Sequence, residues 1–137
     1  MKRHLTLHND VGEIPQLAAF IDETAEEAGI DMAVAMSLNL AMEEAVVNVM
    51  NYAYPAGTVG DIDIDAECAD GQLTFVISDS GTPFDPTQAH DPDVTLQAED
   101  RAIGGLGIFL VRQIMDHIEY QYRDGKNILS LTKNITQ

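Results

Sequence analysis

Several short stretches alternate apolar and polar residues with a period of two, a pattern that predicts β-strands. The first is residues 3–9, and the second is the Asp-Ile repeat of residues 61–67. A turn at residues 69–71 joins that repeat to an apolar run at residues 73–78, so these two strands should form a hairpin. A second hairpin is predicted near the C-terminus, with strands at residues 118–123 and 128–133 around a turn at residues 124–127.

Three other stretches repeat their apolar residues at helical spacing. Residues 12–28 do so with acidic residues on the opposite face, and Gly29 is a suitable C-terminal stop. Asp31 is a good N-cap for a long helix over residues 32–54, which Pro55 ends. A third helix is expected over residues 106–117.

The predicted elements follow the order β-α-α-β-β-loop-α-β-β, without repeats or an interdomain linker. Paired hairpins favour an antiparallel or mixed sheet, and three helices would cover one face of it. We therefore predict one α+β (α/β) domain over residues 1–137, a two-layer sandwich with its helices on one face of the sheet.

The net negative charge of the chain disfavours some classes of binding partner. The chain of 137 residues has 7 Lys and Arg against 23 Asp and Glu, a formal net charge of −16 at pH 7. Such a surface disfavours direct binding to nucleic acid or to an anionic membrane. A ligand that carries phosphate would have to be held by backbone dipoles, a metal ion or a rare cation. With one cysteine, no zinc-binding spacing and no leader or long apolar run, we expect a cytoplasmic protein.

Polar residues interrupt the apolar part of the long helix. Glu44 and Asn48 are one turn apart on one face, and Asn51 extends that line, whereas Glu43 lies round the helix and should be solvated. A carboxylate and two carboxamides among valines are costly to bury unless something satisfies them. The alternative is that Glu44 lies at the edge of the apolar face and is hydrogen-bonded to a loop.

Two further segments are candidates for ligand contact. Asp79 ends a predicted strand and is followed by Gly81, so an acceptor lies beside backbone that a flat ligand can approach, although the same pattern also forms ordinary turns. Glycine-rich backbone from Gly104 to Gly107 opens the third helix, where N–H groups and the helix dipole favour an anion. The absence of a preceding strand and of a Gly-Lys-Ser/Thr sequence excludes a Rossmann fingerprint and a P-loop.

Together, in this order, the three segments resemble the GHKL (Bergerat-fold) ATPases, and within them the anti-sigma factor serine/threonine kinases. The supporting stretches are residues 44–54, 79–86, 104–116 and 124–133, and the similarity extends over essentially the whole chain. The resemblance implies the Bergerat ATP-binding fold, with ATP and Mg²⁺ as ligands.

The resemblance also implies roles for individual residues. Glu44 would be the general base, Asn48 would hold Mg²⁺, and Asp79 would accept a hydrogen bond from the adenine amine. The glycines at the start of the third helix would cradle the phosphates beneath a lid at about residues 84–103. The residues implied to contact ATP are Asn48, Asn51, Asp79, Gly81, Thr82, Pro83, Arg101, Gly104, Gly105, Leu106 and Gly107.

Two positions leave questions open. Tyr52 stands where the family commonly has a histidine, so we assign it no catalytic role. Arg101 is a cation in an acidic predicted lid, and it would contact the γ-phosphate or pair with Glu99 or Asp100.

The resemblance implies an ATP-dependent kinase that acts on a serine or threonine of a STAS-domain anti-sigma antagonist and also binds a sigma factor. Homodimers are common in the family, but the sequence indicates no interface. A histidine kinase is disfavoured, since the chain has no room for a phosphoacceptor helical hairpin. Two alternatives stay open, a partner-switching module that binds nucleotide without transferring phosphate, and an acidic scaffold without a ligand.

Overall fold

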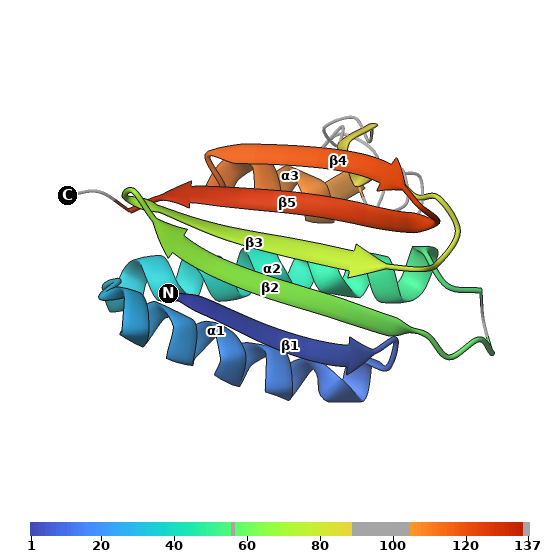
Figure 1. The fold of residues 1–137 in the computed structure, drawn as a ribbon, viewed down its shortest axis with the longest axis horizontal. Helices are drawn as coiled ribbons and strands as arrows, with labels where there is room; N and C mark the ends of the chain where they lie inside the picture. The colour runs from blue at the N-terminus through green and yellow to red at the C-terminus, as the bar shows by residue number, and fades with distance from the viewer. Residues whose placement is uncertain (56, 89–104, 136–137) are drawn as a thin grey trace.

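Five strands form one sheet in which every neighbouring pair is antiparallel. The computed structural model describes residues 1–55, 57–88 and 105–135 (Figure 1). The strands lie in the order β1-β2-β3-β5-β4, with bounds Lys2–His8 for β1, Asp61–Ala69 for β2, Gln72–Asp79 for β3, His117–Arg123 for β4 and Lys126–Asn134 for β5. Both predicted hairpins are confirmed, and the sheet is antiparallel throughout.

Three α-helices lie on the same face of this sheet, as the face-on view of Figure 1 shows. They are α1 (Ile14–Ala28), α2 (Met32–Tyr52) and α3 (Gly105–Ile114), and short 3-10 turns η1 (Val11–Glu13) and η2 (Pro86–Gln88) precede α1 and follow β3. The predicted two-layer α+β sandwich is confirmed. Gly29 ends α1 with a φ of 72°, and the Asp31 side chain caps α2 by accepting from the Val34 N–H at 3.0 Å.

The third helix is shorter than the sequence predicted. The Met115 N–H still donates to the Val111 carbonyl at 2.9 Å, but the Asp116 N–H donates to Thr132 of β5 at 2.9 Å. The backbone is therefore drawn into the β4–β5 hairpin at that point, and α3 ends at Ile114.

The core lies between the sheet and the helices. Alternate residues of the strands face the helices and are buried, among them Leu7, Ile62, Ile64, Leu73, Phe75, Ile77, Leu129 and Leu131. Among the described residues, α2 alone is long and apolar enough to span a membrane by length and composition. Its buried residues, from Leu38 to Met50, belong to the same core cluster as the strands, so packing against the sheet accounts for its apolar composition.

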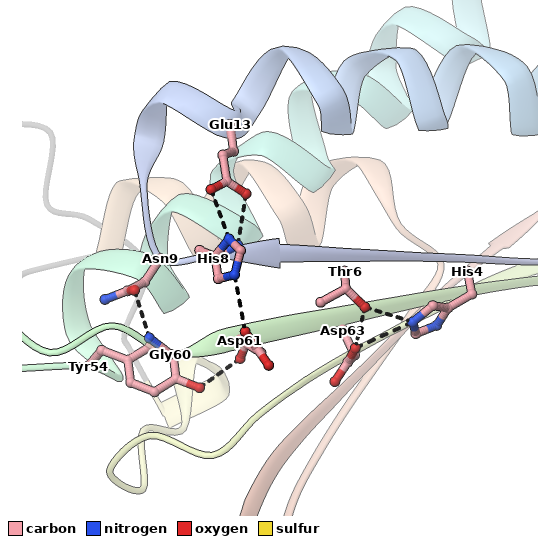
Figure 2. A network of polar contacts seen from close by, with 9 residues as sticks. All are labelled: His4, Thr6, His8, Asn9, Glu13, Tyr54, Gly60, Asp61 and Asp63. Carbon is pink, nitrogen blue, oxygen red and sulfur yellow. Dashed lines mark hydrogen bonds and ion pairs between the residues drawn. The ribbon is translucent and has the colours of Figure 1, made fainter.

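The opposite face of the sheet is polar along β1 and β2. The register pairs His4 with Asp65, Thr6 with Asp63 and His8 with Asp61. His4 Nδ1 lies 2.7 Å from Asp65. The Thr6 hydroxyl donates to Asp63 at 2.7 Å, and His8 Nε2 lies 3.5 Å from Asp61 (Figure 2). His4 and His8 are exposed on this face, and among the described residues no group of three or more His, Cys, Asp or Glu side chains is arranged to hold a metal ion.

This cross-strand contact gives a prediction for His4. The hydrogen bond to Asp65, with the charges of Asp65 and Asp63, raises the pKa of His4 above 6.5, although burial opposes the shift. The contact therefore stabilises the fold at acidic pH and is lost as the pH rises through the folded-state pKa. NMR titration of the imidazole should give a midpoint above 6.5, and Asp65→Asn should lower it.

Asp70→Asn is the matched control, because it removes one acidic charge at the β2–β3 turn instead of beside the imidazole. A His4 midpoint that responds equally to both substitutions would mean that general charge, and not the Asp65 contact, sets its value.

Candidate functional site

Two polar side chains occupy the sheet face that otherwise carries the apolar core. Asp79 ends β3 and pairs in register with Asn127 of β5, and the two residues are only 3% and 4% exposed. Asp79 Oδ1 accepts from Asn127 Nδ2 at 2.9 Å and from the Gly81 N–H at 2.8 Å. Since both bonds end on Oδ1, the second carboxylate oxygen is left for a donor from outside the described residues.

Burial raises the pKa of the Asp79 carboxyl above its usual value, while the bonds from Asn127 and Gly81 act in the opposite direction. A further N–H donor from a ligand would favour the charged form in the same way as these two bonds do. Asp79 is thus suited to accept a hydrogen bond from a neutral N–H group.

Asn127 connects three parts of this site. Its Nδ2 also donates to the Thr82 carbonyl at 2.9 Å, and its Oδ1 accepts from the Phe84 N–H at 2.9 Å and from the Tyr120 hydroxyl. Both amide hydrogens and both lone pairs of the carboxamide are therefore used. The sequence pattern places Asn127 in a turn and does not indicate this role, because its partners come from β3, β4 and the segment after β3.

The segment after Asp79 lies directly on the C-terminal end of α2. A Cβ at Gly81 would lie 2.3 Å from the Ala53 carbonyl oxygen, so the close approach requires glycine. The same carbonyl accepts from the Thr82 N–H at 2.7 Å and from its hydroxyl at 3.0 Å. Ala53 is five residues after Asn48, about 7.5 Å along the helix axis, so the two predicted motifs meet here.

Aromatic residues hold this junction together. The Tyr54 hydroxyl donates to the Asp61 carbonyl at 2.7 Å and accepts from the Ser80 N–H at 3.0 Å (the first bond is drawn in Figure 2). Tyr52 packs against Phe84 with 5.6 Å between ring centroids. Tyr52 therefore contacts the segment that leads into the predicted lid. Residues 89–103 of that lid lie outside the described residues.

Glu44 and Asn48 of α2 have different surroundings. Glu44 is half-buried, and within the described residues it makes no hydrogen bond, so the alternative of a bond to a loop is not found there. Asn48 is 7% exposed, and its buried Nδ2 has no partner among the described residues. Leaving such a group unpaired costs about 1–3 kcal/mol, which favours a ligand at this side chain. Glu43 is exposed, as predicted.

The glycine-rich segment opens α3, whose first turn is formed by the backbone of Gly105, Leu106 and Gly107. The helix start was predicted correctly to within one residue. Gly104 and Arg101 lie outside the described residues. The buried side chains of Ile108 and Val111 belong to the core cluster that α2 also enters, so the start of α3 lies in the same helical layer as Glu44 and Asn48.

Asn51 and Pro83 are both exposed. Asn51 is exposed and lines a cavity of about 620 Å³ with residues of the β1–α1 connection and of residues 57–59, whereas Asp79, Gly81 and Thr82 do not line it. Thr82 and Pro83 are exposed beside Gly81. The structure thus brings Gly81 and Thr82, next to Asp79, against Ala53 at the end of α2, two residues after Asn51.

These residues and this sheet define a class of protein. The model of the histidine kinase-like ATPase domain matches residues 7–133, and the chain belongs to that family. It is 34% identical to the serine/threonine-protein kinase BtrW of Bordetella bronchiseptica over 98 residues, which are 72% of this chain and 69% of BtrW. It is 32% identical to the serine-protein kinase RsbW of Listeria monocytogenes over 117 residues, 82% of this chain and 74% of RsbW.

Solved structures share the fold. The crystal structure of the RsbU and RsbW domains of a Mycobacterium tuberculosis protein matches all of this chain and 33% of its own, with a TM-score of 0.71 and 18% identity. The histidine kinase domain of a blue-light activated kinase from Erythrobacter litoralis matches 91% of this chain and 60% of its own, with a TM-score of 0.58 and 15% identity.

The bonding of Asn127 predicts its effect on stability. Asn127→Ala removes four hydrogen bonds at once and leaves the buried Asp79 carboxylate and the part-buried backbone groups of Thr82 and Phe84 without this partner. We expect a loss of about 1–3 kcal/mol in the free energy of unfolding, measured in urea.

Asn134→Ala is the control, since it is the same substitution in β5 but at an exposed residue that bonds to Gln72. That variant should lose less than about 0.5 kcal/mol. Equal losses in the two variants would show that the Asn127 network does not stabilise the fold.

Proposed function

We propose that this chain is an ATP- and Mg²⁺-dependent protein kinase that phosphorylates a serine or threonine of a STAS-domain anti-sigma antagonist and also sequesters a sigma factor. Membership of the ATPase family and the kinase names of BtrW and RsbW support the proposal. The observation that carries it is the buried Asn48 carboxamide, whose unpaired Nδ2 can donate to an acceptor such as a phosphate oxygen, one turn from the half-buried Glu44.

Recognition of the base falls to Asp79. Its open carboxylate oxygen is an acceptor for the adenine amine. Gly81 and Thr82 follow Asp79 along the chain and pack against the C-terminal end of α2. Guanine has a carbonyl oxygen at the corresponding position, so two acceptors would face each other. The backbone N–H groups at the start of α3, with Gly104 before them, would hold the phosphates. Arg101 remains a candidate for contact with the γ-phosphate.

Asn48 would hold Mg²⁺ through its side-chain oxygen, as the resemblance to the GHKL ATPases implies. Among the described residues, no group of three or more His, Cys, Asp or Glu side chains offers another metal site. Magnesium is commonly bound by one or two protein groups together with substrate phosphates and water, which this single carboxamide fits. The bound ion would neutralise part of the triphosphate charge in a protein of net charge −16.

Glu44 is the general base of the proposed reaction. It accepts the proton of the substrate hydroxyl as that oxygen forms its bond to the γ-phosphorus, while the bond from phosphorus to the ADP oxygen breaks. Its half-buried position leaves it accessible to a hydroxyl, and the described residues give it no competing partner. Loss of such a base typically slows a reaction 10²–10⁴-fold.

The partners follow from charge. The acidic surface suits basic, DNA-binding elements of a sigma factor and disfavours direct binding of nucleic acid or membrane. We also propose a cytoplasmic location. A homodimer is consistent with the family, and no residue described here is assigned to its interface.

A second candidate function is a nucleotide-gated partner-switching module without phosphate transfer. It is favoured by Tyr52, which stands where the family commonly has a histidine and which packs its ring on Phe84. Phosphotransfer to a purified STAS-domain protein distinguishes the two functions.

Substitution of Asp79 tests base recognition. The wild type should prefer ATP over GTP by about 1–3 kcal/mol. In Asp79→Asn, the bonds from Gly81 and Asn127 keep the side-chain oxygen in place, so an amide donor faces the base. Calorimetry should then show weakened ATP binding and a smaller preference over GTP, with the fold retained. Unchanged ATP affinity would remove Asp79 from the site.

Two substitutions in α2 test the kinase mechanism. Glu44→Gln retains the shape of the side chain but cannot take a proton, so it should bind Mg-ATP like the wild type and phosphorylate its partner about 10²–10⁴-fold more slowly. Asn48→Ala should weaken ATP binding in the presence of Mg²⁺ and abolish transfer.

Glu43→Gln is the matched control, since Glu43 is the exposed neighbour of Glu44 on the same helix. The Glu43→Gln protein should transfer phosphate at the wild-type rate. If the wild type binds ATP and a sigma factor but phosphorylates no candidate partner, the binding module is the correct function.

A further inference from the structure

The N-terminal half of α2 exposes three large apolar side chains in one line. Met32 is 79% exposed, Met36 is 68% exposed and Leu40 is 42% exposed. Their spacing of four residues places them one above another along the helix. Exposed apolar side chains are ordinary when they are scattered, but a contiguous row on one helix marks an interaction surface. We call these three residues the α2 stripe.

A recess runs beside the α2 stripe. A cavity of about 280 Å³ lies between α2 and α3, lined by Ala33, Val34, Ser37, Gln113, Ile114 and Lys133. Ala33 and Ser37 directly follow Met32 and Met36 along the chain, so the recess adjoins the stripe. Ridges beside a recess on a helical surface suit the packing of another helix, whose side chains fill the recess.

The other border of the stripe is acidic. Asn39, next to Leu40, donates to Asp22 of α1 at 2.8 Å, which places this exposed carboxylate beside the stripe. Glu26, one turn further along α1, and Glu43, three residues after Leu40, are exposed as well. The nearby cation, Lys133, is held by the Ile114 carbonyl at 2.8 Å and by Asp116 at 3.7 Å.

The acidic border of the α2 stripe distinguishes between three possible occupants, which are a second copy, an anionic membrane and a helix of a partner protein. A second copy seated on the α2 stripe would bring its own acidic border against Asp22, Glu26 and Glu43, and an anionic membrane would be repelled. A helix with an apolar face and a basic rim complements both the methionines and the carboxylates. Methionine side chains also adapt their shape to different apolar partners.

We propose that the α2 stripe is a docking surface for a basic amphipathic helix of a partner protein. Its residues precede Glu44 and Asn48 along α2, and none belongs to the proposed nucleotide site. The inference therefore does not rest on the proposed function, and ATP binding should persist when the stripe is altered.

Methionine methyl NMR tests the surface directly. In protein labelled at the methionine methyl groups, Met32 and Met36 report on the stripe, and the buried Met42 and Met50 report on the core. The probe is a helical peptide of about 18 residues with leucine on one face and lysine on the rest. We expect the peptide to shift the Met32 and Met36 signals and to leave those of Met42 and Met50 in place. A peptide with glutamate for lysine should have no effect.

Substitutions in the α2 stripe provide a second test of the proposed docking surface. The double substitution Met36→Gln and Leu40→Gln retains good helix formers and should weaken binding of the lysine peptide at least tenfold, with ATP affinity unchanged. Val59→Gln is the control, because Val59 is 80% exposed but lies in the loop before β2.

Four results would overturn the proposal. They are lysine-peptide binding without shifts of Met32 and Met36, equal binding of the two peptides, unchanged affinity in the double variant, and shifts of Met32 and Met36 that depend on protein concentration alone. The last result would indicate a second copy as the occupant.

Discussion

A carboxylate and a carboxamide are buried side by side in the face of the sheet that packs against the helices, and the geometry of the site depends on this pair. Asp79 is stable there because Asn127 and the Gly81 N–H donate to it. Asn127 in turn bonds to Thr82 and Phe84, and these bonds hold the segment after β3 against the end of α2. Because both hydrogen bonds to Asp79 end on one oxygen, the other oxygen has no donor among the described residues and can accept one from a ligand.

The helix α2 combines two demands that usually conflict. It must be apolar to fill the core between α1, α3 and the sheet, and it must carry Glu44 and Asn48, which an apolar environment disfavours. The conflict is resolved by position. Glu44 remains half-buried, and Asn48 is buried with an amide hydrogen unused, which is stable when a ligand supplies the partner. The exposed α2 stripe lies nearer the start of the same helix.

Local periodicity predicted the elements, and it did so because the helices and strands each have one apolar face. The predicted end of α3 was wrong, because the helix ends where the Asp116 N–H donates to the Thr132 carbonyl of β5. Asp79, Gly81 and the Glu44–Asn48 pair were found because each motif is contiguous along the chain. Asn127 was missed because its partner is 48 residues away and only the pairing of β3 with β5 reveals it.

The proposed function requires that the Asn48 carboxamide faces bound nucleotide and metal. Side-chain amide NMR signals test it most directly, with Asn39 as an internal reference because its amide already donates to Asp22. Addition of Mg-ATP should shift the Asn48 signal strongly and leave that of Asn39 unchanged, and omission of Mg²⁺ should reduce the shift. An Asn48 signal that does not move while calorimetry shows ATP binding would contradict the account and place the nucleotide elsewhere.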